Sequence, residues 1–208
     1  AAPSPTPDPL AVSSPDGSIV LTFALQDGVP TYRVDVDGLP LLLPSRLGFK
    51  LKDAPPLGEG MRLIEASQST FDDTWEQPWG EARLVRNHHH ELRVLIEETS
   101  AAPRQLALVF RVFDDGIGFR YEVPTQPDLA AFIIQDELTE FVYTADHEIW
   151  YIPAFQGNRY EYLYTAARLS EAGTSMHTPM TLRTVDRPAG QLYVAMHEAA
   201  LVDYASMT

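Results

Sequence analysis

Three consecutive histidines, His88, His89 and His90, are the most obvious candidate metal ligands in the sequence. Neutral imidazole nitrogen is a common ligand of zinc and other transition metals. Adjacent residues of a β-strand point to opposite faces of the sheet, so at most His88 and His90 could share one ion. The run also fits a solvated strand edge that continues into Glu91, and we favour this second interpretation.

Adjacent carboxylates occur at residues 72–73, 97–98 and 136–137. Hydrolysis of a glycosidic bond by two carboxyl groups requires that they face each other across the sugar. Neighbours on a strand cannot do so, and we interpret these pairs as solvated turns and edges. His197 and Glu198 are more suggestive, because a histidine and a glutamate could act as acid and base on a sugar hydroxyl. Their local spacing does not establish that role.

Three tryptophans carry rings that could either fill a core or stack on the face of a sugar. Trp75 and Trp79 lie in the segment TFDDTWEQPWGE, residues 70–81. Tryptophan is highly buried on average, so we expect both rings to pack in the core of the protein. Trp150 lies between Ile149 and Tyr151 and is expected in the core as well.

Composition excludes several classes of function. The chain of 208 residues has 15 basic and 29 acidic residues, a formal net charge of −14 that disfavours binding to nucleic acids or anionic membranes. It has no cysteine, which excludes disulfides, thiolate metal sites and cysteine nucleophiles. No phosphate-binding glycine loop, Gly-x-Ser-x-Gly motif, His-Glu-x-x-His motif or EF-hand loop is present.

Alternating apolar residues and turn signals predict an all-β fold. Four Asp-Gly pairs, at residues 16–17, 27–28, 37–38 and 115–116, supply the positive φ angles that tight hairpin turns require. Only residues 161–172 suit a short helix or turn. Many strands without intervening helices favour an antiparallel β-sandwich. The expected strands are residues 19–25, 32–36, 39–43, 92–96, 106–113, 116–121, 132–134, 149–152, 180–183 and 192–196.

The length corresponds to one large domain, or to one domain and part of another. Residues 1–12 begin with AAPSPTPDP and are expected to form a Pro-rich linker or a disordered N-terminus, and residues 13–208 are expected to form the sandwich. The chain does not start with Met, and a Pro-rich stretch often follows a cleaved leader. We therefore expect an exported protein, periplasmic or on the cell surface.

Several blocks of the sequence, read in order, resemble the N-terminal domain of glycoside hydrolase family 97, which includes α-glucosidases and α-galactosidases. The resemblance implies a β-super-sandwich related to galactose mutarotase, with its last strands missing from this chain. It also implies that the sandwich forms part of the wall of the active-site pocket. The blocks are SPDGSIVLTF (14–23), TFDDTWEQPWGE with RNHHHEL (70–92), FRVFDDGIGFRYEVP (110–124), YIPAFQGNRYEYLYTAARLSE (151–171) and HEAALVDYASMT (197–208).

The same resemblance implies partners and a metal ion. An α-linked oligosaccharide would be the substrate, and a (β/α)8 catalytic barrel and a C-terminal domain of the same enzyme would complete the protein. The catalytic carboxylates would lie on the barrel, so this chain alone is expected to be inactive and no catalytic residue is assigned to it. Glu161 would be one ligand of a calcium ion shared with the barrel, which must supply other ligands because calcium takes about six to eight oxygens.

Two other functions stay open at this point. The chain could be a free-standing carbohydrate-binding module that uses Trp75 or Trp79 as a stacking platform. It could also be a mutarotase-like sugar epimerase with His197 and Glu198 as acid and base.

Overall fold

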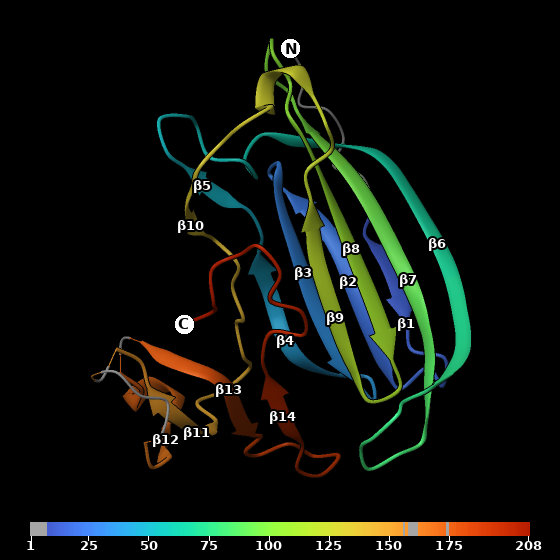
Figure 1. Cartoon of the computed structure of the whole chain (residues 1–208), viewed down its shortest axis with the longest axis vertical. Coiled ribbons are helices and arrows are strands. Elements are labelled where there is room, and N and C mark those ends of the chain that lie inside the picture. The colour runs from blue at the N-terminus through green and yellow to red at the C-terminus, as the bar shows by residue number, and fades with distance from the viewer. Residues whose placement is uncertain (1–7, 156, 158–161, 174) are drawn as a thin grey trace. The chain divides into compact units, whose positions relative to one another are not determined.

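The computed structural model describes residues 8–155, 157, 162–173 and 175–208 (Figure 1). The chain divides into two compact units, residues 1–142 and 143–208. Its regular structure consists of antiparallel strands and two single-turn 3-10 helices, η1 (Pro127–Leu129) and η2 (Leu169–Glu171). This confirms the all-β prediction. Within the described ranges, no helix is long and apolar enough to cross a membrane.

The first sheet of unit 1 is an antiparallel meander in the order β1-β2-β3-β4. Asp27 and Gly28 connect β2 to β3, and Asp37 and Gly38 connect β3 to β4. All four have positive φ, as the mirror-image turns of tight hairpins require, so both predicted turns are confirmed. The strands are β1 (Leu10–Ser13), β2 (Ile19–Gln26), β3 (Val29–Val36) and β4 (Leu39–Arg46).

The expected N-terminal linker is shorter than predicted. Residues 10–12 belong to β1, in which Leu10 pairs with Phe23 and Val12 pairs with Leu21. Val12 is buried. An apolar side chain at the centre of a short edge strand therefore extends the folded region into the segment expected to be a linker.

The second sheet of unit 1 has the order β6-β7-β8-β9 and packs face to face on the first (Figure 1). The ring of Phe110 on β8 lies 6.1 Å from that of Phe23 and 6.3 Å from that of Tyr32, which places this aromatic cluster at the centre of the core. Alternate residues of β7 face the first sheet, and Leu92, Val94 and Ile96 among them are buried. The strands are β6 (Met61–Glu76), β7 (Leu84–Glu98), β8 (Gln105–Phe113) and β9 (Gly116–Glu122).

The predicted hairpin between β8 and β9 is confirmed, but its turn differs from the expected one. Phe113 pairs with Gly116, so the connecting residues are Asp114 and Asp115 and neither has positive φ. Gly116 is the first residue of β9 and has no positive φ either. The Asp-Gly pair at residues 115–116 therefore does not supply the left-handed conformation that we predicted.

Two short strands, β5 (Phe49–Leu51) and β10 (Ile134–Glu137), form a separate two-stranded sheet of unit 1. The strand expected at residues 132–134 thus begins two residues later than predicted. Asp136 and Glu137 lie exposed on β10. Asp72 and Asp73 are also exposed, on the edge strand β6, so these two pairs occupy the sheet edges that we expected.

Unit 2 contains a four-stranded sheet in the order β12-β11-β13-β14, whose core is Ile149, Tyr151, Met180 and Leu182. The expectation of a short helix or turn in residues 161–172 is wrong over residues 165–168, which form β12. Ala167 pairs with Ile149 and packs on this core, so tertiary contact outweighs the helical tendency of alanine. The strands are β11 (Glu148–Pro153), β12 (Thr165–Arg168), β13 (Met176–Arg183) and β14 (Tyr193–Met196).

The interpretation of Glu98 as a solvated carboxylate is wrong. Its side chain is buried and forms an ion pair with Arg104, whose Nε donates to the Glu98 carboxylate at 2.7 Å. Arg104 also donates to the carbonyls of Pro55 and Pro56. The charged pair therefore ties the β7–β8 connection to the loop after β5. Glu97 differs, because it pairs with the exposed guanidinium of Arg62.

Breaking the buried pair should cost far more stability than breaking the exposed one. We expect Arg104→Met to lower the free energy of unfolding by about 3–5 kcal/mol, because it leaves the Glu98 carboxylate buried without its partner. The matched change Arg62→Met should cost less than about 1 kcal/mol. Urea unfolding of both variants measures the difference, and equal losses would contradict the assignment of the Glu98 pair to the core.

Candidate functional site

The structure separates the three histidines. His88 and His90 belong to the alternate set of β7 residues that faces the first sheet, and His90 Nδ1 lies 2.8 Å from the backbone oxygen of Ser13. His89 belongs to the opposite face and is only 2% exposed, so the expectation of a solvated edge is wrong for it. In the part of the chain that the structure describes, no three histidine, aspartate or glutamate side chains gather as metal ligands.

His89 is buried because aromatic rings from two other strands cover it. Its ring stacks on Phe71 of β6, with 5.4 Å between the ring centres, and lies 4.8 Å from the ring of Phe113 at the end of β8. His89 Nδ1 is 2.8 Å from Asn87 Oδ1. Burial, together with the nearby positive charge of Arg111, lowers the pKa of His89. The histidine is therefore a neutral member of an aromatic stack at physiological pH.

The tryptophans of residues 70–81 are not in the core, which overturns our prediction. Trp75 is 51% exposed and Trp79 is 85% exposed. Both lie on the β6–β7 hairpin beyond the end of β8, where the last pair between β7 and β8 is His90 with Val112. Among the described residues, no third strand pairs with the hairpin at this point. Trp150 is partly exposed, and the Arg183 guanidinium lies 5.8 Å from its ring centre.

His197 and Glu198 are engaged by the backbone of their own segment. His197 Nδ1 lies 2.9 Å from the Glu198 carbonyl oxygen, and the Glu198 carboxylate accepts a hydrogen bond from the backbone N–H of Met207 at 2.7 Å. This arrangement orders the C-terminal segment of the chain. One ring nitrogen of His197 and one carboxylate oxygen of Glu198 are therefore engaged within this segment, and neither hydrogen bond joins the two side chains.

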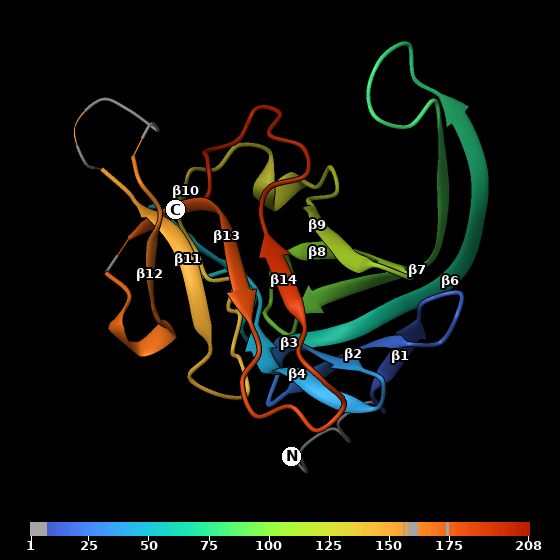
Figure 2. The same ribbon diagram turned by 90° about the horizontal axis from the view of Figure 1, so that it is seen from below.

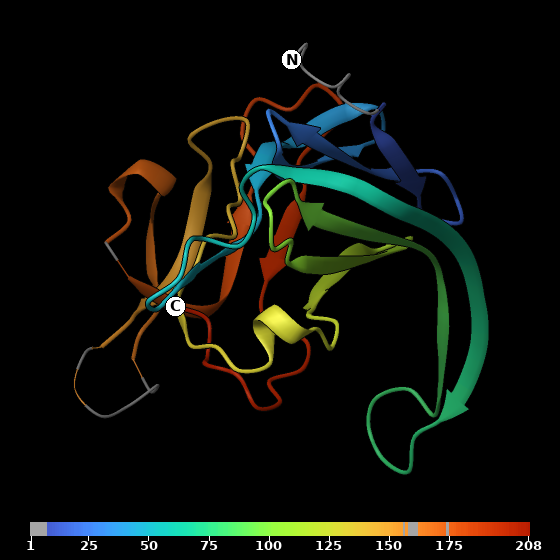
Figure 3. The same cartoon turned by 90° about the horizontal axis from the view of Figure 1, so that it is seen from above.

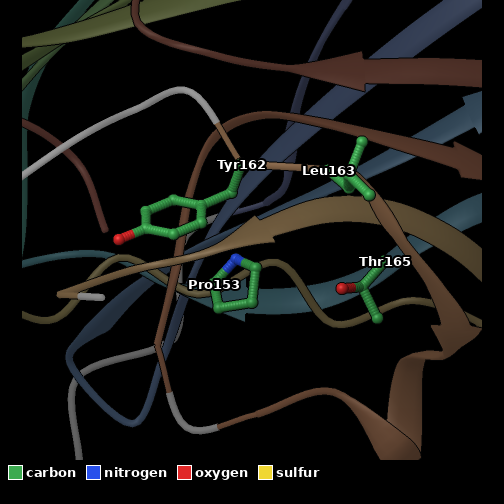
Figure 4. Close-up of a pocket in the computed structure, with 4 residues that line it drawn as sticks. All are labelled: Pro153, Tyr162, Leu163 and Thr165. Atoms are coloured by element: carbon green, nitrogen blue, oxygen red, sulfur yellow. The ribbon is translucent and has the colours of Figure 1, made fainter. Parts of the chain in front are cut away.

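The candidate functional site lies after β11 in unit 2, where the described residues line a surface hollow of about 330 Å³ (Figure 4). Pro153 ends β11 and Thr165 begins β12, so these two paired strands each contribute one residue to the lining. Tyr162 and Leu163 complete its lining. Glu161 precedes Tyr162 directly in sequence but lies outside the described residues, so nothing in the structure tests its predicted role.

The backbone near this hollow turns sharply. Phe155 has a φ of 59°, a left-handed conformation that is rare for a bulky residue, and its side chain is 74% exposed. Gly157 also has positive φ, and a Cβ atom at that position would lie 2.9 Å from the Tyr162 hydroxyl. Glycine therefore permits the close approach of Tyr162. Uncommon backbone conformations of this kind often accompany binding sites.

The hollow suits binding rather than proton transfer. Leu163 is 91% exposed and, with Phe155, Tyr162 and Tyr164, leaves an apolar and aromatic surface outside the core of unit 2. The side-chain polar groups in its lining are the hydroxyls of Tyr162 and Thr165. Such surfaces on a folded domain generally mark the place where a ligand or a partner binds. The family resemblance pointed only to Glu161 in this segment. The aromatic residues beside it, Tyr162 and Tyr164, could have been recognised from the sequence as candidate binding residues.

The family model described as "Glycosyl-hydrolase 97 N-terminal" matches residues 12–208. The chain belongs to this family. The match includes strands of both larger sheets of unit 1 and the segment after β11, so the resemblance read from the sequence blocks is confirmed.

Solved structures support this assignment. A glycoside hydrolase family 97 enzyme from Pseudoalteromonas sp. strain K8 is 35% identical, with a TM-score of 0.89 in its complex with panose and also in its complex with acarbose. In both cases the match covers 95% of this chain but 29% of that chain. A β-arabinopyranosidase structure, 22% identical with a TM-score of 0.73, shares the fold over 91% of this chain and 35% of its own.

A curated relative extends the comparison. The retaining α-galactosidase of Bacteroides thetaiotaomicron is 24% identical over 135 residues, which are 65% of this chain and 19% of that enzyme. This family 97 domain therefore spans less than a third of the length of the Pseudoalteromonas and Bacteroides enzymes that it matches.

The buried His89 predicts a pH-dependent stability. Because its pKa in the folded state lies below the ordinary value of 6.5, the unfolded chain binds the proton first as the pH falls. The stabilisation is complete above about pH 6.5 and is lost below it, by up to about 1.4 kcal/mol per pH unit for each such histidine. His89→Phe keeps an aromatic ring in the stack, and unfolding in urea between pH 8 and pH 5 should show a smaller pH dependence.

His147 is also buried, and burial lowers its pKa as well. This second histidine accounts for the pH dependence of stability that His89→Phe retains. An unchanged pH dependence in His89→Phe would contradict the neutral, buried state assigned to His89.

Proposed function

We propose that this chain is the non-catalytic N-terminal domain of an α-glycosidase of family 97. In this proposal it packs on a (β/α)8 catalytic barrel and forms part of the wall of the pocket that binds an α-linked oligosaccharide. The family match over residues 12–208 supports the assignment. The Pseudoalteromonas enzyme, whose solved structures are complexes with panose and acarbose, supports the substrate class, and its greater length leaves room for a separate catalytic domain.

One observation carries the role in the pocket wall: the exposed aromatic and apolar side chains after β11. Leu163 and Phe155 are held outside the core of unit 2 while β11 and β12 fix the ends of their segment. Aromatic rings bury the apolar face of a sugar, and hydroxyl groups such as those of Tyr162 and Thr165 exchange hydrogen bonds with its polar edge. We assign to these side chains the binding and orientation of substrate, with bond cleavage left to the barrel.

We also propose that Glu161 supplies one carboxylate ligand to a calcium ion between the two domains. The donors fit in kind, because calcium prefers carboxylate oxygens, but not in number, because it takes about six to eight oxygen ligands. No group of three metal-ligating side chains occurs in the described part of the chain, so further carboxylates from the barrel are needed. When bound, such an ion would stabilise negative charge and orient sugar hydroxyls.

The purified chain should not hydrolyse aryl α-glycosides, because the proposal places the acid and the base or nucleophile on the barrel. Release of nitrophenol from p-nitrophenyl α-glucoside and α-galactoside, followed at high protein concentration, measures this. Turnover that co-purifies with the chain and exceeds the buffer rate would overturn the assignment as a non-catalytic domain.

The calcium role predicts that replacing Glu161 weakens metal binding by the whole enzyme. Terbium, which can replace calcium and whose luminescence is excited by neighbouring aromatic rings, should bind the enzyme with an affinity reduced at least about tenfold by Glu161→Gln. The matched change Glu171→Gln on η2 should have no effect. Equal terbium affinity in the wild type and Glu161→Gln would remove Glu161 from the proposed site.

A further inference from the structure

A protruding part of the β6–β7 hairpin has no place in the core of unit 1. We define the arm as residues 71–89, the part of this hairpin beyond the last pair of β7 with β8. We infer that one face of the arm is a docking surface for the catalytic domain of the same enzyme. This inference rests on the proposed function and extends it, because it names the surface by which the two domains associate.

The residue pairs across β6 and β7 give the arm two different faces. One face, here called the aromatic face, carries the pairs Phe71–His89, Asp73–Asn87 and Trp75–Val85. The other face carries Asp72–His88, Thr74–Arg86 and Glu76–Leu84. Because side chains alternate between the two sides of a strand, a single register separates an aromatic face from a charged one. Such alternation is typical of a sheet with one face buried.

The aromatic face is exposed in unit 1. Phe71 is 46% exposed and Trp75 is 51% exposed, whereas the inner end of the face is packed through His89 on Phe113. Figures 2 and 3 show β6 and β7 bending away from β1–β4 beyond β8. The row of rings therefore begins in the sheet, where His89 packs on Phe113, and continues onto the arm with Phe71 and Trp75.

The geometry favours a protein surface over a sugar as the occupant. A two-stranded ribbon without a third strand or a packed layer is marginally stable in water. The exposed rings and their cross-strand neighbours extend over five residues, about 17 Å of strand. A continuous protein surface can supply a packing layer of that length. The matched enzyme structures are more than three times as long as the portion this chain covers, which provides a domain large enough to do so.

The charged residues of the arm indicate which side chains the partner surface should carry. On the charged face, Arg86 forms two hydrogen bonds of 2.7 Å with Asp72, and Arg83 pairs with Glu76 at 2.9 Å. Asp73 lies on the aromatic face between Phe71 and Trp75, and within the described residues no cation pairs with it. We therefore infer that the partner surface is apolar and carries a basic side chain opposite Asp73.

Binding of the chain to the separately produced catalytic domain, measured by titration calorimetry, tests the inference. Trp75→Ser should weaken binding at least about tenfold, because an aromatic anchor is lost from the interface. Asp73→Asn should weaken it about threefold to tenfold and reduce its dependence on salt. Ile133→Ser, which alters an exposed apolar residue of the β5–β10 region, is the matched control and should bind as the wild type does. Near-UV circular dichroism verifies that each variant is folded.

Hydrogen exchange on the same samples separates the possible outcomes. The inference predicts that amides of residues 71–76 and 84–89 become protected when the catalytic domain is added. Wild-type binding that neither protects the arm nor weakens in Trp75→Ser would overturn this inference and leave the proposed function standing. No binding by the wild type would overturn both. Protection of the arm by panose alone, or by raising the concentration of the chain alone, would overturn the inference in favour of a sugar or a second copy.

Discussion

The register of β7 is the constraint on which unit 1 depends. Every second residue of this strand faces the first sheet, and Leu92, Val94 and Ile96 in this set are fully buried. The register of β7 cannot shift by one residue, because such a shift would expose these three side chains and bury charged neighbours such as Arg93. From the pair Glu65–Leu95 onward, the pairing of β7 with β6 continues without a further register shift past the end of β8, so the core also determines which side chains of the arm share a face.

One consequence is a change of character along the outer face of the second sheet. Over β7, β8 and β9 that face carries ion pairs such as Arg111 with Glu91 and Arg120 with Glu122. Beyond β8 it carries aromatic rings instead. Solvated ion pairs of this kind contribute little to stability. The same face also contains Ala107 and Val109 of β8, which are buried, so it is not exposed to water throughout. The exposed rings of the arm are the part of this face on which we infer that the partner packs.

Unit 2 likewise has a buried core and separate apolar side chains that remain at the surface. Four buried residues, Ile149, Tyr151, Met180 and Leu182, hold its sheet together. The segment between β11 and β12 contributes Phe155 and Leu163 to the surface instead of to that core. Binding residues commonly lie in connecting segments that a rigid sheet positions, which supports the proposal that this segment contributes to the substrate pocket.

The sequence predicted the strands that alternate between apolar and polar residues, because that pattern follows directly from burial on one side. It did not predict β6, since every residue from Ile64 to Glu76 is exposed and no apolar alternation marks the strand. The tryptophan prediction failed for a related reason: whether Trp75 is buried depends on where β8 ends. His89 and Glu98 are buried by distant partners, Phe113 and Arg104, that local patterns cannot reveal. The role of Glu161 came from the family resemblance alone.

Reconstitution of activity tests the central claim most directly. The catalytic domain, produced without this chain, would be assayed on p-nitrophenyl α-glycosides while the chain is added in increasing amounts. We predict that neither protein alone is an efficient catalyst and that turnover rises and saturates as the chain binds, since the pocket wall is then complete. An unchanged rate at saturating concentrations of the bound chain would contradict the assignment of this domain to the substrate pocket.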